Sequence, residues 1–220
     1  MPNPQNPILT TFQIELLNRL GKSPLREAFF LTGGTALAAC YLHHRLSEDL
    51  DFFTGEPGRI RQVPPVLESL VKEHGYGLKI SRQFSTFLEV FITSPEGETI
   101  KADFAEDAPY RLQPLEKSPW NMKVDNPLDI ACNKLSALFE RAAAKDFVDL
   151  YFIAQKLYPL EDLLPQAQKK HVGLDAYWLA IAFQHVEKID KWPVMKLPCD
   201  FSALTQFFLT KARGLLQPLE

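Results

Sequence analysis

The sequence predicts an α+β fold in which a mixed sheet with flanking helices is followed by an all-helical C-terminal domain. Two observations predict this organisation. Short apolar runs and alternating segments, which are typical of strands, occur only in the amino-terminal half. From Leu128 onwards every periodic segment has helical spacing. We therefore divide the chain into an α/β domain over residues 1–115 and a helical domain over residues 116–220.

The amino-terminal half is expected to begin with an amphipathic helix, because apolar residues recur at helical spacing from Leu9 to Leu20 and Gly21 follows. Prolines near its start and a glycine at its end indicate a second helix over residues 63–75. The other elements expected here are a helix over residues 35–44 and strands over residues 28–32, 49–54, 78–84, 87–93 and 99–105.

The middle of the chain changes character. Residues 106–127 contain four prolines and little periodicity, which predicts a linker or an embracing loop. The helices expected after it cover residues 128–140, 145–157, 160–170, 174–188 and 201–215.

Composition limits the classes of protein to consider. A net charge of -3 gives no global basic field for binding long nucleic acids. Three cysteines, far apart and without a CxxC pair, argue against a disulfide framework or a zinc site and favour a reducing cytoplasm. No basic segment precedes a short apolar run as in a secretory signal, and the uncharged run over residues 28–44 contains a Gly-Gly pair, so neither secretion nor membrane insertion is expected.

A two-glycine turn joins an apolar strand to a helix. The strand ends at Thr32, Gly33 and Gly34 follow, and Thr35 begins the helix. Glycine lets a ligand approach the main chain closely, and the amide groups at the start of a helix favour a phosphate. The turn is therefore a candidate phosphate site, although a Gly-Gly pair alone is also typical of a tight turn without a ligand.

Two acids follow on the next predicted strand. Asp49 and Asp51 are separated by one residue, so on a strand both point to the same face, roughly 7 Å apart at the backbone. Their oxygens can converge on a hard cation such as Mg²⁺, which binds carboxylate and phosphate oxygens. Taken in isolation, a pair of this kind is more often part of a solvated strand edge, because surface acids are common.

The order of these elements strengthens the metal-site interpretation. Consecutive strands are usually neighbours in a sheet, which places the acids beside the glycine turn. Asp103, on a later strand, is a third candidate metal ligand, and in two-metal phosphoryl transfer such an acid also activates the attacking hydroxyl. No Gly-Lys-Ser or Gly-Lys-Thr phosphate loop is present, which disfavours a P-loop enzyme.

Two runs of the sequence resemble one family. Residues 30–53, FLTGGTALAACYLHHRLSEDLDFF, are similar to the signature of the AbiEii-type toxin nucleotidyltransferases, which belong to the DNA polymerase β-like nucleotidyltransferase superfamily. Residues 134–151, KLSALFERAAAKDFVDLY, resemble the second signature of that family in the same order.

The resemblance implies a nucleotidyltransferase-like sheet domain that binds a nucleoside triphosphate, followed by a helical domain that helps enclose it. By position, Gly33, Gly34 and Thr35 match the nucleotide-binding turn, and Asp49 and Asp51 match the metal pair. The resemblance adds residues outside this turn and pair. They are a lysine that would meet phosphate, the acid of the last motif, and an arginine and a serine before the acid pair, at Lys134, Asp146, Arg45 and Ser47.

Some assignments stay open at this point. Asp149 fits the last motif as well as Asp146 does, since both lie in the run KDFVDLY. Basic residues beside them would neutralise a triphosphate, but the same pattern is typical of a salt-bridged helix surface. The alignment of Asp103 with the family's motif depends on a variable strand, so its catalytic role also stays open. His43, His44 and Cys40 lack further ligands, which favours a core or surface role over a metal site.

We therefore predict a Mg²⁺-dependent enzyme that transfers a nucleoside monophosphate from a nucleoside triphosphate to an acceptor hydroxyl. The resemblance implies the toxin of a type IV-like toxin-antitoxin system, with tRNA, another RNA or a protein as acceptor and a cognate antitoxin as partner. The alternative is a non-catalytic nucleotide-binding regulatory protein, which the intact acid pair disfavours.

Overall fold

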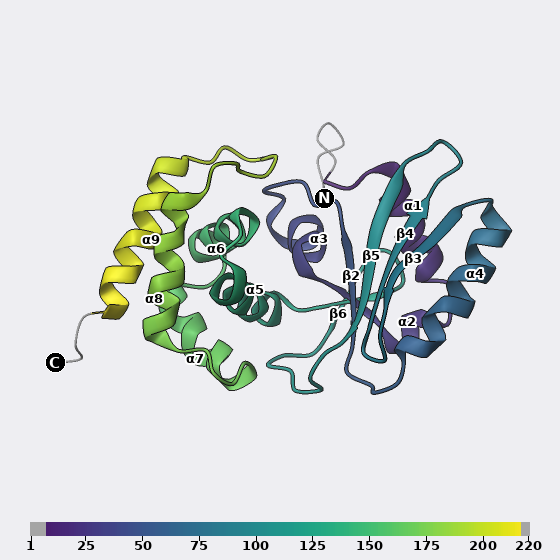
Figure 1. Ribbon diagram of the computed structural model, residues 1–220, viewed down its shortest axis with the longest axis horizontal. Coiled ribbons are helices and arrows are strands. Elements are labelled where there is room, and N and C mark those ends of the chain that lie inside the picture. The colour runs from purple at the N-terminus through teal and green to yellow at the C-terminus, as the bar shows by residue number, and fades with distance from the viewer. Residues whose placement is uncertain (1–7, 217–220) are drawn as a thin grey trace. The chain divides into compact units, whose positions relative to one another are not determined.

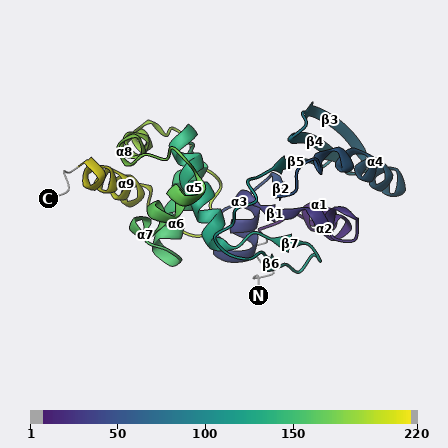
Figure 2. The same ribbon diagram turned by 90° about the horizontal axis from the view of Figure 1, so that it is seen from below.

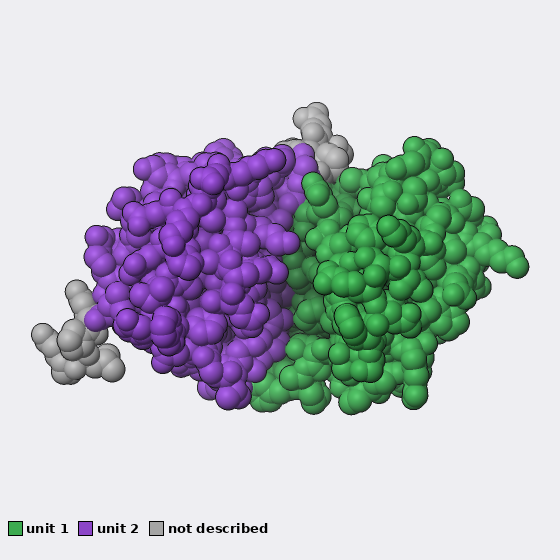
Figure 3. Space-filling model, in the orientation of Figure 1, with its two compact units in different colours: residues 1–41, 47–126 green, residues 42–46, 127–220 purple. Residues whose placement is uncertain are grey.

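The computed structural model describes residues 8–216 of the chain. The chain forms two compact units, which Figure 3 colours separately: unit 1 consists of Met1–Tyr41 with Ser47–Asn126, and unit 2 of Leu42–Leu46 with Pro127–Glu220. None of the helices within residues 8–216 has the length and apolar character needed to cross a membrane.

Unit 1 contains the sheet and several helices. The first helix is fixed by a capping box, in which the Thr10 side chain accepts from the Gln13 backbone and the Gln13 side chain accepts from the Thr10 backbone. The fourth α-helix is capped at its C-terminus by Gly75, whose backbone is left-handed and whose N–H donates to the carbonyl oxygen of Val71. The helices of this unit, of which Figure 1 labels α1 to α4, are α1 Thr11–Leu20, α2 Leu25–Ala28, α3 Gly33–Ala36, η1 Leu37–Leu42, η2 Ile60–Gln62 and α4 Val63–His74.

Within residues 8–216, seven strands form one mixed sheet in the order β3-β4-β5-β2-β1-β7-β6. The β2–β5 and β1–β7 pairs are parallel, and the other neighbours are antiparallel. The strands are β1 Phe30–Thr32, β2 Leu50–Thr54, β3 Gly77–Gln83, β4 Phe87–Thr93, β5 Thr99–Glu106, β6 Glu116–Lys117 and β7 Lys123–Val124. The mixed sheet with flanking helices is confirmed.

The two faces of the sheet differ. On β2, Leu50 and Phe52 are fully buried, and Phe52 stacks on Phe104 of β5 at 4.9 Å between ring centroids. Because side chains alternate along a strand, Asp51 lies on the opposite face. Figure 2 shows α1, α2 and α4 on one side of the strands and α3 on the other.

Residues 106–127 are more ordered than the prediction of a linker or loop. The strands β6 and β7 lie in this segment, and β7 pairs in parallel with β1, Phe30 with Lys123 and Leu31 with Val124. The interpretation as a linker or loop is wrong for the residues of β6 and β7, whereas residues 107–115 and 118–122 form no helix or strand. Strands of two residues have no periodicity that a sequence could display, and their stability comes from neighbours in the sheet.

Unit 2 is helical, as predicted. Its helices are α5 Pro127–Arg141, α6 Ala144–Lys156, α7 Leu160–Lys170, α8 Ala176–Gln184, η3 His185–Lys188 and α9 Phe201–Leu216. Aromatic rings fill its core, where Phe208 of α9 packs against Phe147 of α6 and Phe183 of α8 at about 5 Å between ring centroids. The short segment Leu42–Leu46 also belongs to this unit. Within it, the backbone of Arg45 forms an isolated antiparallel β-bridge with Met195.

Candidate active site

The turn between β1 and α3 brings a glycine backbone against a carboxylate. Gly33 has a φ of 69°, in the left-handed region that side chains rarely adopt. A Cβ atom at this position would lie 2.1 Å from Oδ2 of Asp51. The approach follows from the sheet, since Thr32 and Asp51 are register partners on β1 and β2. Glycine at position 33 therefore permits both the turn and the position of Asp51.

The loop before β2 is held from two helices. From α1, the buried Gln13 donates its Nε2 hydrogens to the carbonyl oxygens of Ser47 at 2.9 Å and Glu48 at 3.1 Å. From α3, the Thr35 hydroxyl donates to the carbonyl oxygen of Asp49. These bonds fix the backbone that carries the first acid.

Three acids and a glycine turn meet on one face of the sheet. Asp51 and Asp103 are register partners on the parallel strands β2 and β5, so their side chains share a face. Asp49 directly precedes β2, and its side chain is 34% exposed, against 15% for Asp103. The arrangement that the sequence predicted for Asp49, Asp51 and Asp103 therefore depends on the β5-β2-β1 order of the sheet.

A lysine that the sequence analysis did not single out lies among these acids. Nζ of Lys101 is 2.8 Å from Oδ2 of Asp103 and 3.4 Å from Oδ2 of Asp49. Burial acts to lower the pKa of Lys101, but the hydrogen bond to Asp103 and the charges of the acids outweigh it and raise this pKa above its usual value. Lys101 is thus a protonated cation at neutral pH.

The donors of this group suit a hard cation. They are carboxylate oxygens, which Mg²⁺ prefers, and Oδ1 of Asp103 is buried without a hydrogen-bond partner among the described residues. The ammonium group of Lys101 is itself a cation placed between two of the acids, Asp49 and Asp103. In the part of the chain that the structure describes, no three His, Cys, Asp or Glu side chains converge as a preformed metal cluster. The residues present fit a metal bound together with a ligand, because a triphosphate supplies further oxygens.

A second group of predicted residues lies in unit 2, around the fully buried Asp149. Arg45 binds both carboxylate oxygens of Asp149, at 2.6 and 2.8 Å. Lys134 approaches Oδ2 at 2.7 Å and His44 approaches Oδ1 at 2.8 Å. Burial acts to raise the pKa of Asp149, but the charges of Lys134 and Arg45 outweigh it and hold this pKa well below its usual value.

His44 behaves differently from the two cations beside it. Burial lowers its pKa, and this effect exceeds the opposing attraction of Asp149. The neutral imidazole therefore serves as a hydrogen-bond partner at neutral pH, in the core of the unit.

Asp146 occupies the neighbouring position on α6. Arg141 binds its two carboxylate oxygens at 2.8 and 2.9 Å, and Nζ of Lys134 lies 3.6 Å away. Lys134 therefore lies between the two acids that the sequence could not separate, and it is nearer to Asp149. Both acids are fully buried, which distinguishes this group from a solvated helix surface.

The sequence-predicted residues therefore form two groups. The first, the sheet group, lies in unit 1 and contains Gly33, Gly34, Thr35, Ser47, Asp49, Asp51 and Asp103. The second, the helix group, lies in unit 2 and contains Arg45, Lys134, Asp146 and Asp149. Sequence reasoning missed Lys101, Gln13 and the bond of His44. For Lys101 a signal existed, because a residue two positions before Asp103 on a strand lies on the same face.

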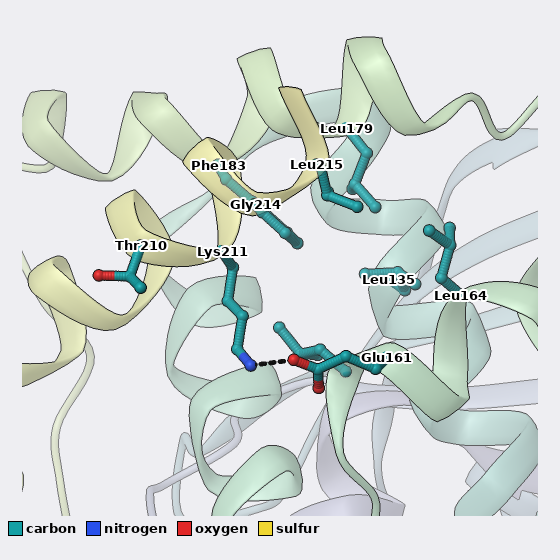
Figure 4. Close-up of a pocket in the computed structure, with 10 residues that line it drawn as sticks. Leu135, Glu161, Leu164, Leu179, Phe183, Thr210, Lys211, Gly214 and Leu215 are labelled. Carbon is teal, nitrogen blue, oxygen red and sulfur yellow. Dashed lines mark hydrogen bonds and ion pairs between the residues drawn. The ribbon is translucent and has the colours of Figure 1, made fainter. Parts of the chain in front are cut away.

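A cavity of about 420 Å³ in unit 2 contains none of these residues (Figure 4). It is mostly apolar, lined by Leu135, Leu179 and Phe183 among others, and an ion pair between Lys211 and Glu161 lies at its wall.

Solved structures of other proteins have a similar fold. A provisionally named nucleotidyltransferase from Helicobacter pylori has a similar fold, with a TM-score of 0.61 and 19% identity, covering 97% of this chain and 96% of that one. MenT4, a nucleotidyltransferase toxin from Mycobacterium tuberculosis, gives a TM-score of 0.55 and 16% identity, covering 93% and 81%. The chain therefore has a nucleotidyltransferase fold.

The sequence comparison identifies the family. The family model described as "Nucleotidyl transferase AbiEii toxin, Type IV TA system" matches residues 15–190. An uncharacterised protein of Aquifex aeolicus, aq_aa25, is 27% identical over an alignment of 217 positions that covers 93% of this chain and 96% of the relative. The chain belongs to the AbiEii nucleotidyltransferase toxin family, as the two signature runs predicted.

Proposed function

We propose that this protein transfers a nucleoside monophosphate from a nucleoside triphosphate to an acceptor hydroxyl, with Mg²⁺ held by the sheet group. The observation that carries the proposal is the close approach of Asp51 to Gly33, which joins a carboxylate to a strand-to-helix turn. Membership of a nucleotidyltransferase family supports the same reaction.

The reaction balances as a displacement at phosphorus. The acceptor oxygen forms a bond to the α-phosphorus, and the bond from that phosphorus to the oxygen bridging the β-phosphorus breaks. Pyrophosphate leaves with the electron pair, and the hydroxyl proton passes to a base or to water. When bound, Mg²⁺ neutralises charge that develops on the phosphate oxygens.

The residues of the sheet group have separate roles in this proposal. Asp49 and Asp51 are the metal ligands, and Asp103 is the third acid, placed to bind the cation or accept the hydroxyl proton. The backbone of Gly33, Gly34 and Thr35 faces the phosphates. Gln13 keeps the loop at Ser47 in place because its side-chain amide donates a hydrogen bond to the Ser47 carbonyl oxygen.

The helix group supplies positive charge and a rigid support. We assign phosphate binding to Lys134 and the orientation of its ammonium to Asp149, which Arg45 and His44 hold in place. Asp149 fits the last motif better than Asp146, because it binds Lys134 at 2.7 Å and Asp146 is bound to Arg141.

The acceptor and the biology are assigned on the family alone. A toxin of a type IV-like toxin-antitoxin system would modify tRNA, another RNA or a protein and would be countered by a cognate antitoxin. The name of the family and the toxin MenT4 support this assignment. The alternative function, a regulatory protein that binds nucleotide without catalysis, predicts nucleotide affinity with no transfer.

A labelling screen separates these functions. The full chain is incubated with Mg²⁺, total cellular RNA and each α-labelled nucleoside triphosphate in turn, and RNA and protein are then separated and counted. We expect label in a macromolecule with at least one nucleotide. Binding of a nucleotide without any transferred label would contradict the enzyme proposal and support the regulatory one.

A further inference from the structure

The position of Lys101 is set by the sheet. Asp51 and Asp103 are register partners on the parallel strands β2 and β5. Asp49 and Lys101 each lie two residues earlier, so the pleat places them on the same face and at the same level. The ammonium of Lys101 therefore reaches Asp49 and Asp103 because of the strand register, and its distances of 3.4 and 2.8 Å follow from that arrangement.

Lys101 competes for the oxygens that a second metal ion would need. It contacts Oδ2 of Asp49 and Oδ2 of Asp103. A magnesium ion binds carboxylate oxygens at about 2.1 Å, whereas the ammonium occupies the space between the same two atoms. Both cations cannot take these positions at once.

Without nucleotide, the charges agree with this conclusion. The three carboxylates carry a formal charge of about -3, which one divalent ion and one ammonium neutralise, so the carboxylates by themselves do not require a second divalent ion. The next acid along the row, Glu89, already has its own cation: Arg82 binds it at 2.6 and 3.1 Å, and this hydrogen bond lowers the pKa of Glu89 to about 2. The direct contacts of Lys101 are with Asp49 and Asp103.

We propose that Lys101 takes the place of one metal ion, so that this enzyme binds its nucleotide with a single divalent cation. The inference rests on the proposed function. Lys101 is a positioning residue: it neutralises Asp103 and holds it beside Asp49. Asp51, the oxygen of Asp49 that Lys101 does not contact, and the triphosphate hold the one metal.

The test counts metal ions. Mn²⁺ replaces Mg²⁺ in the full chain, with a non-hydrolysable α,β-methylene triphosphate kept below the protein concentration, and bound Mn²⁺ is measured by electron paramagnetic resonance. We expect one Mn²⁺ per bound nucleotide in the wild type and in Lys101→Arg, and two, with magnetic coupling between them, in Lys101→Met. Without nucleotide, Lys101→Met should bind Mn²⁺ roughly tenfold more tightly than the wild type, because a neighbouring positive charge is removed.

The matched control is Lys79→Met, which removes an exposed lysine from β3 of the same sheet. It should give the wild-type count and affinity. Two ions in the wild type, or one ion in a folded Lys101→Met, would overturn the proposal. If Lys101→Met does not fold, Lys101→Gln takes its place, and the wild-type count still decides.

The result also separates the two proposals. Two ions in a wild type that transfers label from α-labelled triphosphate would reject the single-cation inference and leave the proposed function standing. No bound Mn²⁺, together with no transfer, would reject both.

Discussion

The sheet group and the helix group both combine carboxylates with basic side chains, but they differ in exposure. Asp49 and Asp103 are 34% and 15% exposed, whereas Asp146 and Asp149 are fully buried. Cations at the sheet group can exchange with solvent, while the ion pairs of the helix group are enclosed by the fold. We therefore expect the metal chemistry at the accessible carboxylates and structural support from the buried ones, Asp146 and Asp149.

Replacing one acid of the sheet group should produce the largest effect on activity. Asp51→Asn removes a charge from a metal ligand with almost no change in volume, so we expect transfer activity to fall by roughly a thousandfold or more. The melting temperature should change little. Initial rates of label transfer measure the effect, and Asp190→Asn, at an exposed position outside both groups, is the matched control. Near-normal activity in Asp51→Asn would break the distinction between the groups.

The corresponding change in the helix group should act on stability. Asp149→Asn leaves Arg45 and Lys134 as buried cations without their carboxylate, which costs about 3–5 kcal/mol. Denaturant unfolding measures the loss, and Asp162→Asn, exposed at the start of α7, should change the free energy of unfolding by less than about 0.5 kcal/mol. A small loss in Asp149→Asn would mean that the buried group is not a structural support.

The pH dependence of stability also tests whether the buried Asp149 supports the fold. The folded-state pKa of Asp149 lies below its unfolded value of about 3.9. Its contribution to stability is therefore present above about pH 4 and is lost as pH falls through the folded pKa. The free energy of unfolding of Asp149→Asn should depend less on pH below about 4 than that of the wild type. Parallel pH curves for the two proteins would contradict this assignment.

A glycine substitution tests the geometry of the sheet group. Gly33→Ala should lose about 1–2 kcal/mol of stability from its left-handed backbone and should also lose activity, since the new methyl group displaces Asp51. Gly97→Ala is the control, because Gly97 also has a positive φ, 91°, but a methyl group added there would have nothing within 4 Å. Both variants should lose stability, and only Gly33→Ala should lose transfer.

The smallest expected effect concerns the support of the acid loop. Gln13→Ala removes the two bonds to the carbonyl oxygens of Ser47 and Glu48 and the capping box of α1, a loss of about 1–2 kcal/mol. Thermal unfolding and the KM for nucleotide measure it. Asn18→Ala, which removes a bond within the same helix, should leave KM unchanged.

Much of the fold was predictable because long elements have periodic sequences. The spacing of apolar residues predicted α1, α4, the strands β3 to β5 and the helices of unit 2. The strands β6 and β7 were missed because two residues cannot show a period. The sequence also did not predict that Arg45 and His44 belong to unit 2. They lie in a short segment between two elements of unit 1, and no local pattern there indicates that their side chains bind Asp149.

The candidate site divides in the same way. Local spacing predicted that Gly33, Gly34 and Asp51 matter, and strand order then placed Asp51 against the turn. The contacts of Lys101 with Asp49 and Asp103 depend on the parallel register of β2 with β5, which no single stretch of sequence contains.

The position of the label in the nucleotide separates transfer of a nucleoside monophosphate from other reactions of the triphosphate. The wild-type chain and Asp51→Asn are incubated with Mg²⁺, total RNA and the active nucleotide, carrying label either at the α-phosphate or at the γ-phosphate. We expect that the wild type places only the α-label in the acceptor and releases the γ-label as pyrophosphate, while Asp51→Asn does neither. Incorporation of the γ-label, or equal α-label transfer by Asp51→Asn, would contradict it.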